Sequence, residues 1–291
     1  WFVSPELRVN YYSPIKDGVI GVGTNFQSSA GYLDNASGHR NLGVDVNYSK
    51  NLSDTRNLTS QLRLNNDFNR MFSLSDEMQN LLGGVPKKDN QGVMWTARLD
   101  EQKNTFHKNR YAVQVGLFES ELNSAVMAIQ DKASSSFIKA QINRSWPGQQ
   151  AREYWSLQSG VDVYSNKVDG SVRSLYLIRA GGGYTRLIDY IWSVDLETSL
   201  AYADDTINGG IYIEPDATLS YNYNDQLGGV ATLSGELKNP TLLEWQEYNR
   251  FLTPSTRLQH SYHIGVSAEV FWNFMQTSRV YSGLQWEHIS R

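Results

Sequence analysis

Apolar and polar side chains alternate residue by residue from Ser261 to Phe274. Because successive side chains of a strand point to opposite faces, this period of two predicts a strand with one apolar and one polar face. The polar face carries small, polar or charged residues, including Ser261, His263 and Glu269. Val280 to His288 repeats the pattern. The apolar positions of the first run have aromatic residues at both ends and are Tyr262, Ile264, Val266, Ala268, Val270, Trp272 and Phe274.

The same alternation recurs along most of the chain, for example at 42–49, 93–100, 192–202 and 211–223. Apolar-out, polar-in strands of about ten residues with aromatic ends are typical of transmembrane β-barrels. The pattern predicts an all-β fold, a transmembrane antiparallel up-and-down β-barrel of about 14 strands, in a range of roughly 12–16. We find no repeat of about 20–50 residues, which argues against a propeller or a solenoid.

Two segments interrupt the alternation. Met71 to Gln91 could form a short helix that ends at Gly83 and Gly84, and Pro240 to Pro254 could form another. The first is either a helix packed in a loop or a plug or lid over a pore. The region from 119 to 135 shows no clear pattern and could be a loop or an extra strand.

Short and long connectors alternate along the predicted strands, as expected when one barrel rim has tight turns and the other long loops. This arrangement puts both chain ends at the long-loop rim, so either a terminal strand is miscounted or missing, or the long loops face the periplasm. Connectors near 16, 53, 104, 148, 187, 225 and 276 are short, those near 36, 81, 132 and 252 are long, and those near 168 and 207 are intermediate.

Composition fits this interpretation. The chain has 291 residues, 40% of them hydrophobic and 12% aromatic, and no run approaches the roughly 18 apolar residues of a membrane helix. It has no cysteine, which excludes disulfides and thiolate metal sites. The net charge of −4 and the lack of a basic stripe argue against nucleic acid as a partner. No secretory signal opens the chain, so we expect residues 1–291 to be a single barrel domain, mature or excised from a longer chain.

The closing segment YSGLQWEH, with Tyr281, Gly283 and Trp286, resembles the assembly signal of Gram-negative outer-membrane β-barrels. His288 departs from that signal, and the usual terminal aromatic residue is absent. By its size and inferred excision, the chain also resembles the C-terminal pore of exopolysaccharide export porins. These resemblances imply a location in the outer membrane and contact with its lipid and lipopolysaccharide.

The polar strand faces provide the candidate functional residues. A lumen lined by charged rings selects ions by sign, and the acidic excess would favour cationic or neutral hydrophilic cargo. The alternative is that these charges pair and brace the barrel wall. The predicted pore-lining residues are Asp45, Arg63, Asp67, Arg98, Asp100, Asp162, Arg173, Arg179, Asp195, Glu197, Glu214, Asp216, Glu236, Lys238, His263, Glu269 and Glu287.

The sequence contains no strong catalytic or metal-binding motif. His260 and His263 fall on opposite strand faces and make a poor metal pair, and neither GxSxG nor HExxH occurs. A hydrolase could combine His263 with Ser267 or Ser261, but the spacing does not choose between them. The pair 204–205 is expected in a loop or turn. We therefore predict no enzyme, no catalytic residue, no metal and no cofactor.

The function hypothesis is an outer-membrane channel for hydrophilic cargo, with polysaccharide export favoured. The alternatives are an outer-membrane lipase or protease, and a scaffold or adhesion barrel that binds a partner through its long loops. The implied partners are outer-membrane lipid and lipopolysaccharide, a hydrophilic polymer or small solute, and periplasmic secretion proteins.

Overall fold

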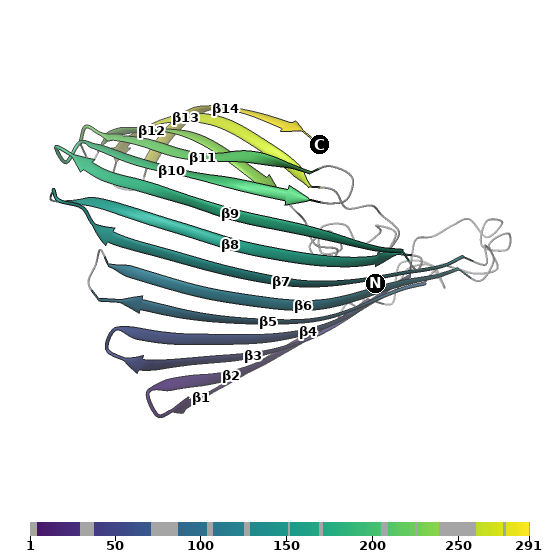
Figure 1. The fold of residues 1–291 in the computed structure, drawn as a ribbon. Helices are drawn as coiled ribbons and strands as arrows, with labels where there is room; N and C mark the ends of the chain where they lie inside the picture. The colour runs from purple at the N-terminus through teal and green to yellow at the C-terminus, as the bar shows by residue number, and fades with distance from the viewer. Residues whose placement is uncertain are drawn as a thin grey trace.

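The computed structural model describes residues 5–29, 38–70, 87–103, 107–124, 129–150, 152–168, 171–204, 209–224, 226–238, 260–275 and 278–290. They form one 14-stranded sheet in which each strand pairs with its neighbours in the sequence (Figure 1). The strands are β1 (Glu6–Ile15), β2 (Gly18–Ser29), β3 (His39–Ser53), β4 (Arg56–Arg70), β5 (Lys87–Gln102), β6 (Lys108–Ser124), β7 (Ile129–Pro147), β8 (Glu153–Val168), β9 (Ser171–Ile188), β10 (Trp192–Asp204), β11 (Gly209–Asn222), β12 (Leu227–Lys238), β13 (Ser261–Met275) and β14 (Ser278–Ser290).

All pairings are antiparallel, and the predicted all-β, up-and-down arrangement is confirmed. The register joins the alternating strands into continuous rows across the sheet. One row is apolar from β2 to β9: Val22, Val46, Leu62, Trp95, Val115, Ile138, Val163 and Tyr176. The next row, on the opposite face, is largely polar: Asn47, Gln61, Thr96, Gln114, Lys139 and Asp162.

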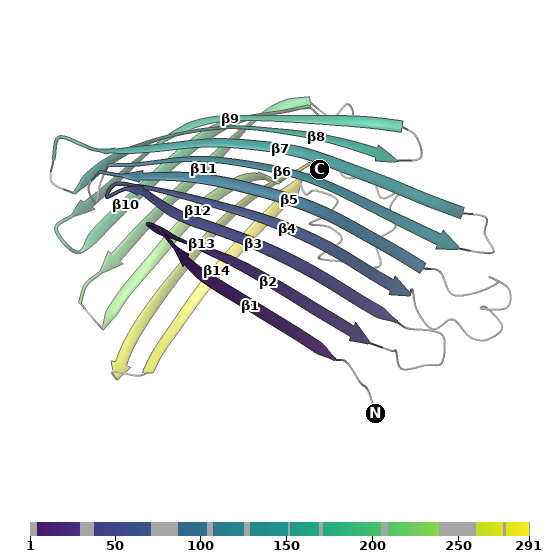
Figure 2. The ribbon, with the colours of Figure 1, turned by 90° about the horizontal axis from the view of Figure 1, so that it is seen from below.

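The polar face is the concave one. Side chains that are buried, such as Phe118, Phe137 and Tyr164, share this face with the polar rows, whereas the apolar rows of the other face are exposed. Figure 2 shows β12–β14 crossing behind β1–β4 at a large angle, so the sheet curls around its concave side. An exposed apolar convex face and a hydrated concave face are what a membrane barrel wall requires.

The two edges of the sheet are β1 and β14, which lie at its lower and upper margins in Figure 1. Within the described residues, no backbone pairing joins β1 to β14. Both strands are almost entirely exposed. The sheet is therefore curved like a barrel wall, with two strands that each have one unpaired side.

The predicted asymmetry of the two rims holds for most connectors. Tight turns join β1 to β2, β3 to β4 and β9 to β10, and Asp17, Arg152, Asp189 and Tyr190 adopt positive φ in turns at this rim. The opposite rim carries the long segments between β4 and β5 and between β12 and β13. Two expectations were wrong: Lys132 lies within β7, and β8 is separated from β9 by only two residues.

The two predicted helical segments lie largely outside the described residues, which omit 71–86 and 239–259. Residues 87–91, which the sequence pattern assigned to the first interruption, belong to β5. The unclear region after residue 119 is mostly strand, divided between β6 and β7. In the part of the chain that is described, no helix has the length and hydropathy needed to cross a bilayer.

The ladder between β11 and β12 ends early, at Asp216 and Ser234. Pro215, the next residue of β11, has no backbone N–H to donate. A Cβ on Gly235 would overlap the Pro215 ring, so only glycine fits this close approach. Beyond this point β12 leaves β11, and Leu237 packs against concave-face residues of β9 and β10. We call residues 235–238 of β12, with Tyr262 of β13, the inward-folded tip.

Candidate functional site on the concave face

The strand register places all of the predicted pore-lining residues on the concave face. They come from β3, β4, β5, β8, β9, β10, β11, β12, β13 and β14. The members of this set are Asp45, Arg63, Asp67, Arg98, Asp100, Asp162, Arg173, Arg179, Asp195, Glu197, Glu214, Asp216, Glu236, Lys238, His263, Glu269 and Glu287.

Several of these charges pair between or along neighbouring strands, at mid-strand for Asp45 and Arg63 and near the tight-turn rim for Asp100. Arg63 Nε donates to Asp45 Oδ1 at 2.9 Å, and these residues are direct register partners. Asp100 accepts from Arg98 Nε at 2.5 Å and from Arg110 Nε at 2.8 Å. Each of these charges has a nearby partner of opposite sign. These residues therefore fit a role in bracing the barrel wall better than a role in an open ring of charge that selects ions.

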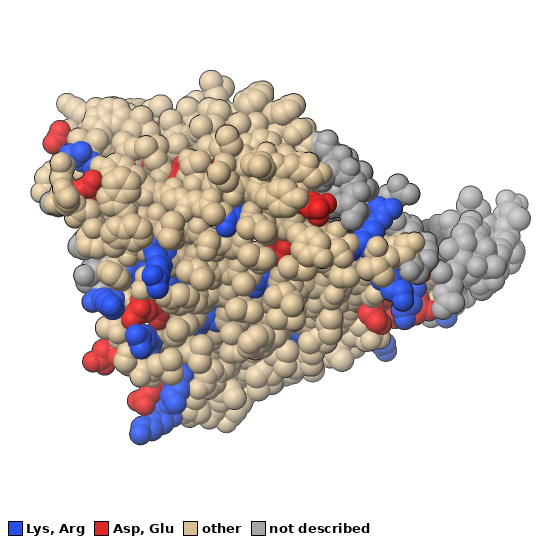
Figure 3. Space-filling view, viewed as in Figure 1, with Lys and Arg blue, Asp and Glu red and all other residues tan. Residues whose placement is uncertain are grey.

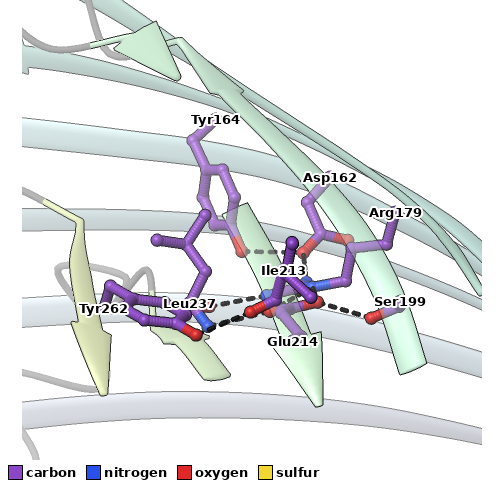
Figure 4. Close-up of polar contacts among 8 residues, drawn as sticks. All are labelled: Asp162, Tyr164, Arg179, Ser199, Ile213, Glu214, Leu237 and Tyr262. Atoms are coloured by element: carbon purple, nitrogen blue, oxygen red, sulfur yellow. Dashed lines mark hydrogen bonds and ion pairs between the residues drawn. The ribbon is translucent and has the colours of Figure 1, made fainter. Parts of the chain in front are cut away.

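A denser network centres on Arg179 of β9 (Figure 4). Its Nε donates to both carboxylate oxygens of Glu214 at 3.2 and 3.1 Å, and Nη1 donates to Asp162 Oδ2 at 3.3 Å. Nη2 donates to the backbone carbonyl of Leu237 at 2.6 Å. Glu214 also accepts from Ser199 Oγ and from the Leu237 backbone N–H, each at 2.8 Å. Arg179 and Glu214 thus satisfy the backbone groups of β12 where its ladder with β11 has ended.

Aromatic groups complete the attachment of the inward-folded tip. Tyr262 Oη donates to the Ile213 carbonyl at 2.6 Å, and Tyr212 Oη lies 2.8 Å from His260 Nε2. Leu237 is fully buried against Leu177 and two alanines of β10. Alternation alone would place Leu237 on the convex face, so the sequence pattern missed this change of environment.

A second polar cluster lies on the concave face toward the long-loop rim. Asp67 of β4 bonds to His39 Nε2 at 2.9 Å and to the Asn69 side-chain amide at 2.5 Å. Asn90 lies between Asp67 and Ser120, and its carbonyl oxygen accepts from Ser120 Oγ at 2.7 Å. The sequence pattern singled out only Asp67 from this cluster, because the start of β5 was assigned to a loop.

Lys88 is fully buried beside this cluster, with Asp67 and Asp131 as nearby charges. A buried ammonium requires compensating carboxylates. If the alternation of β5 had been extended back to Lys87, it would have placed Lys88 on the concave face. Two carboxylates therefore compensate the buried Lys88 ammonium within a densely hydrogen-bonded cluster.

Asp195, Glu197 and Asp216 form an acidic strip on β10 and β11. Glu197 is the direct register partner of Asp216, and Asp195 lies two residues along the same face. Thr185 Oγ1 donates to Asp195 at 2.8 Å. Within the described ranges none of the three has a basic ion-pair partner, so this strip gives the concave face a local negative charge.

The sequence left open whether His263 combines with Ser261 or with Ser267. In the structure, β13 and β14 bring His263 together with Ser261 and Glu287. Ser261 Oγ lies 2.9 Å from His263 Nε2, and Glu287 Oε1 lies 2.9 Å from His263 Nδ1. Ser267 instead bonds to Thr232 at 2.6 Å. Asp204 ends β10, whereas residue 205 lies outside the described part of the chain. In the described residues, no group of three or more His, Asp or Glu is arranged to hold a metal.

The convex face is suited to lipid. Figure 3 shows a broad surface that is largely free of charge, with Lys, Arg, Asp and Glu gathered toward its two ends. By the register, Arg56 and Glu101 lie on this face near the tight-turn rim, and Glu119 and Lys132 lie on it near the long-loop rim. An apolar band between polar margins is the surface expected across a bilayer.

No protein-family model matches the sequence, and no curated protein matches it. Solved structures do match, over nearly the whole chain and about half of their own length. They include a ferric enterobactin receptor mutant of Pseudomonas aeruginosa, with 12% identity, a TM-score of 0.73 and coverage of 98% of this chain and 51% of that one. The ferric-catecholate import receptor Fiu of E. coli K12 has 10% identity, a TM-score of 0.71 and coverage of 99% and 56%. The FrpB iron transporter of Neisseria meningitidis has 7% identity, a TM-score of 0.75 and coverage of 98% and 52%.

These similarities confirm the predicted outer-membrane β-barrel fold. The apolar convex band supports the predicted outer-membrane location independently. The finer resemblance to exopolysaccharide export porins receives no support, because the matching structures reported above are iron-uptake receptors. The chain has the wall architecture of outer-membrane receptor barrels and spans about half of their length.

Proposed function

We propose that this chain forms part of the wall of an outer-membrane barrel that takes up a small iron chelate of the siderophore class. The observation that carries the proposal is the similarity of 98–99% of the chain to iron-uptake receptors. The polar concave face and the apolar convex face support transport of a hydrophilic solute across a bilayer.

The concave face favours a chelate that is neutral or positively charged. The acidic strip of Asp195, Glu197 and Asp216 has no ion-pair partner in the described part of the chain, whereas Asp45, Asp162 and Glu214 each pair with an arginine. Like charges repel more strongly in a partly desolvated lumen than in bulk water. A neutral hydroxamate-type chelate therefore fits this wall better than an anionic catecholate chelate.

We further propose that additional strands complete the barrel. In a bilayer, every backbone N–H and C=O needs a partner, and the outer sides of β1 and β14 lack one in the described sheet. The neighbours, whose chains are about twice as long, support completion by strands of a longer chain. In that arrangement residues 1–291 are one segment of a larger barrel.

Cysteine cross-linking tests barrel completion. Residues 1–291 contain no cysteine, so a cysteine pair introduced at Val9 of β1 and Val280 of β14 adds the only two thiols to this segment. We expect no disulfide between them in the folded full-length protein in outer membranes. Efficient disulfide formation between β1 and β14 would instead show that the 14 strands close on themselves. The directly paired positions Tyr11 and Val22 provide the positive control.

Uptake of radioactive iron tests the transport proposal. Iron-limited cells that express the full-length protein are expected to take up a neutral hydroxamate chelate saturably. The combined variant Asp195→Asn, Glu197→Gln and Asp216→Asn should weaken uptake of a cationic chelate several-fold more than that of a neutral one. Glu119→Gln, which removes a charge from the convex face, is the matched control. Saturable uptake of none of the chelates, with the protein folded in the membrane, would overturn the proposal.

A further inference from the structure

Ser261 and His263 lie two residues apart on β13, so both side chains are on the concave face. Glu287 reaches the same histidine from β14. It is paired in register with Gly265, which has no side chain to separate the carboxylate from the imidazole ring. Diagonal positions of this kind on adjacent strands are within reach of long side chains. The three groups form a continuous chain of hydrogen bonds, serine to histidine to carboxylate, with both distances at 2.9 Å.

The carboxylate determines which histidine nitrogen carries the proton. An ionised carboxylate only accepts hydrogen bonds, so His263 Nδ1 must donate to Glu287. In the neutral ring, Nε2 is then the acceptor and faces the Ser261 hydroxyl. This is the tautomer in which histidine acts as a general base toward a serine nucleophile, with the carboxylate holding the ring and stabilising its protonated form.

The surroundings distinguish this serine from others on the same strand. Ser267 instead pairs with Thr232, and the two hydroxyl oxygens lie 2.6 Å apart. Lys238 is the direct register partner of Ser261 on β12, and its side chain is about half exposed. Its ammonium pairs with Glu236 at 3.7 Å, so a positive group lies on the same face of the sheet as the serine.

We propose that Ser261, His263 and Glu287 form a serine esterase site that acts on water-soluble esters within the lumen. The site lies on the polar concave face, and the side chain of His263 is 18% exposed while that of Glu287 is 44% exposed. A solute in the lumen can therefore reach it, whereas an acyl chain in the bilayer lies against the opposite face. This activity is additional to the proposed uptake and does not depend on it.

The reaction has two balanced halves. Ser261 Oγ bonds to the ester carbonyl carbon while its proton moves to His263 Nε2, and the carbonyl oxygen takes the negative charge. The tetrahedral intermediate then expels the alcohol, which receives the proton from Nε2 and leaves an acyl-serine. Water attacks this acyl group, gives a proton to Nε2, and releases the carboxylic acid as Ser261 Oγ recovers its proton.

Covalent labelling with a fluorophosphonate tests the nucleophile, with the full-length protein in outer-membrane vesicles. We expect one label on Ser261, located by peptide mass spectrometry, and no label after Ser261→Ala. Ser267→Ala is the matched control and should label normally. An unlabelled wild-type protein that is folded, or equal labelling of the Ser261→Ala variant, would overturn the proposal.

Hydrolysis of p-nitrophenyl acetate tests the roles of the other two groups. His263→Ala should lower the rate by on the order of 100-fold or more, with partial recovery on addition of imidazole. Glu287→Gln should lower it by a comparable factor, because the amide no longer favours the required tautomer. Rates unchanged by both substitutions would contradict the assignment.

A second variant keeps the test informative if the alanine variant does not fold. Ser261→Cys preserves the size of the side chain and introduces the only thiol in the chain. If His263 acts as a base there, iodoacetamide should alkylate that thiol at a lower pH than the thiol of Ser267→Cys. Equal pH profiles for the two thiols would show that Ser261 is only a wall residue.

Discussion

The walls formed by β3–β8 and by β9–β13 follow the same alternating pattern but hold their strands together differently. From β3 to β8 the backbone ladders run nearly the full length of each strand, and charges such as Asp45 and Arg63 pair across them. Between β11 and β12 the ladder stops at Asp216, and Arg179 and Glu214 bond to the backbone of Leu237 instead. Side chains can therefore replace a ladder where proline interrupts it, but the stability of that region then depends on a few residues.

The largest expected effect is at Glu214. Replacing it with alanine removes four hydrogen bonds made through its carboxylate and leaves the Arg179 guanidinium without its main counter-charge. We expect a loss of about 3 kcal/mol in the free energy of unfolding, at the lower end for a broken buried pair because Arg179 is 29% exposed. Urea unfolding in detergent measures it. A loss smaller than that measured for Asp45→Ala, which breaks an exposed ion pair, would contradict this comparison of the two walls.

An intermediate effect is expected in the regular wall, at Gly116 of β6. A Cβ at this position would overlap the Phe137 ring, which is buried and packs near Tyr164 with ring centroids 6.1 Å apart. Gly116→Val should destabilise the fold by about 1–3 kcal/mol through overpacking. Adding Phe137→Ala should recover part of that loss, because the two changes share one space. Strictly additive losses would show that the ring does not fill this space.

The smallest effect is expected at the Asp45–Arg63 pair, whose side chains are 33% and 44% exposed. Asp45→Ala should cost about 0–1 kcal/mol, because solvent screens the pair. The cost should shrink further in high salt. Urea unfolding in detergent, as used for Glu214, measures this loss in the free energy of unfolding. Equal losses for the Asp45 and Glu214 variants would remove the distinction between the two walls.

Most of the fold follows from a local rule and could be predicted. A period of two needs no knowledge of partners, so the strands, their antiparallel order and the shared face of Arg63, Asp100 and Glu214 could be read from the sequence. The candidate site was only partly accessible in this way. Alternation placed His263 on the concave face but could not choose between Ser261 and Ser267, because that choice depends on how the imidazole ring is turned.

The failures have a common physical origin in non-local contacts. The burial of Leu237 depends on where β12 leaves β11, which involves the close approach of Gly235 to Pro215. The cluster around Asp67 draws on His39, Asn90 and Ser120, which are distant in sequence. No spacing rule within a single strand identifies partners of this kind.

Within the described residues every strand pairs only with its chain neighbours, so the hairpin is the natural unit of change in this wall. Duplication or loss of two consecutive strands would alter the circumference while leaving each remaining strand in its direction and each connector at its rim. A change of one strand would instead reverse the direction of all later strands and move their loops to the opposite side of the membrane. Variation among walls of this type should therefore proceed in steps of two strands.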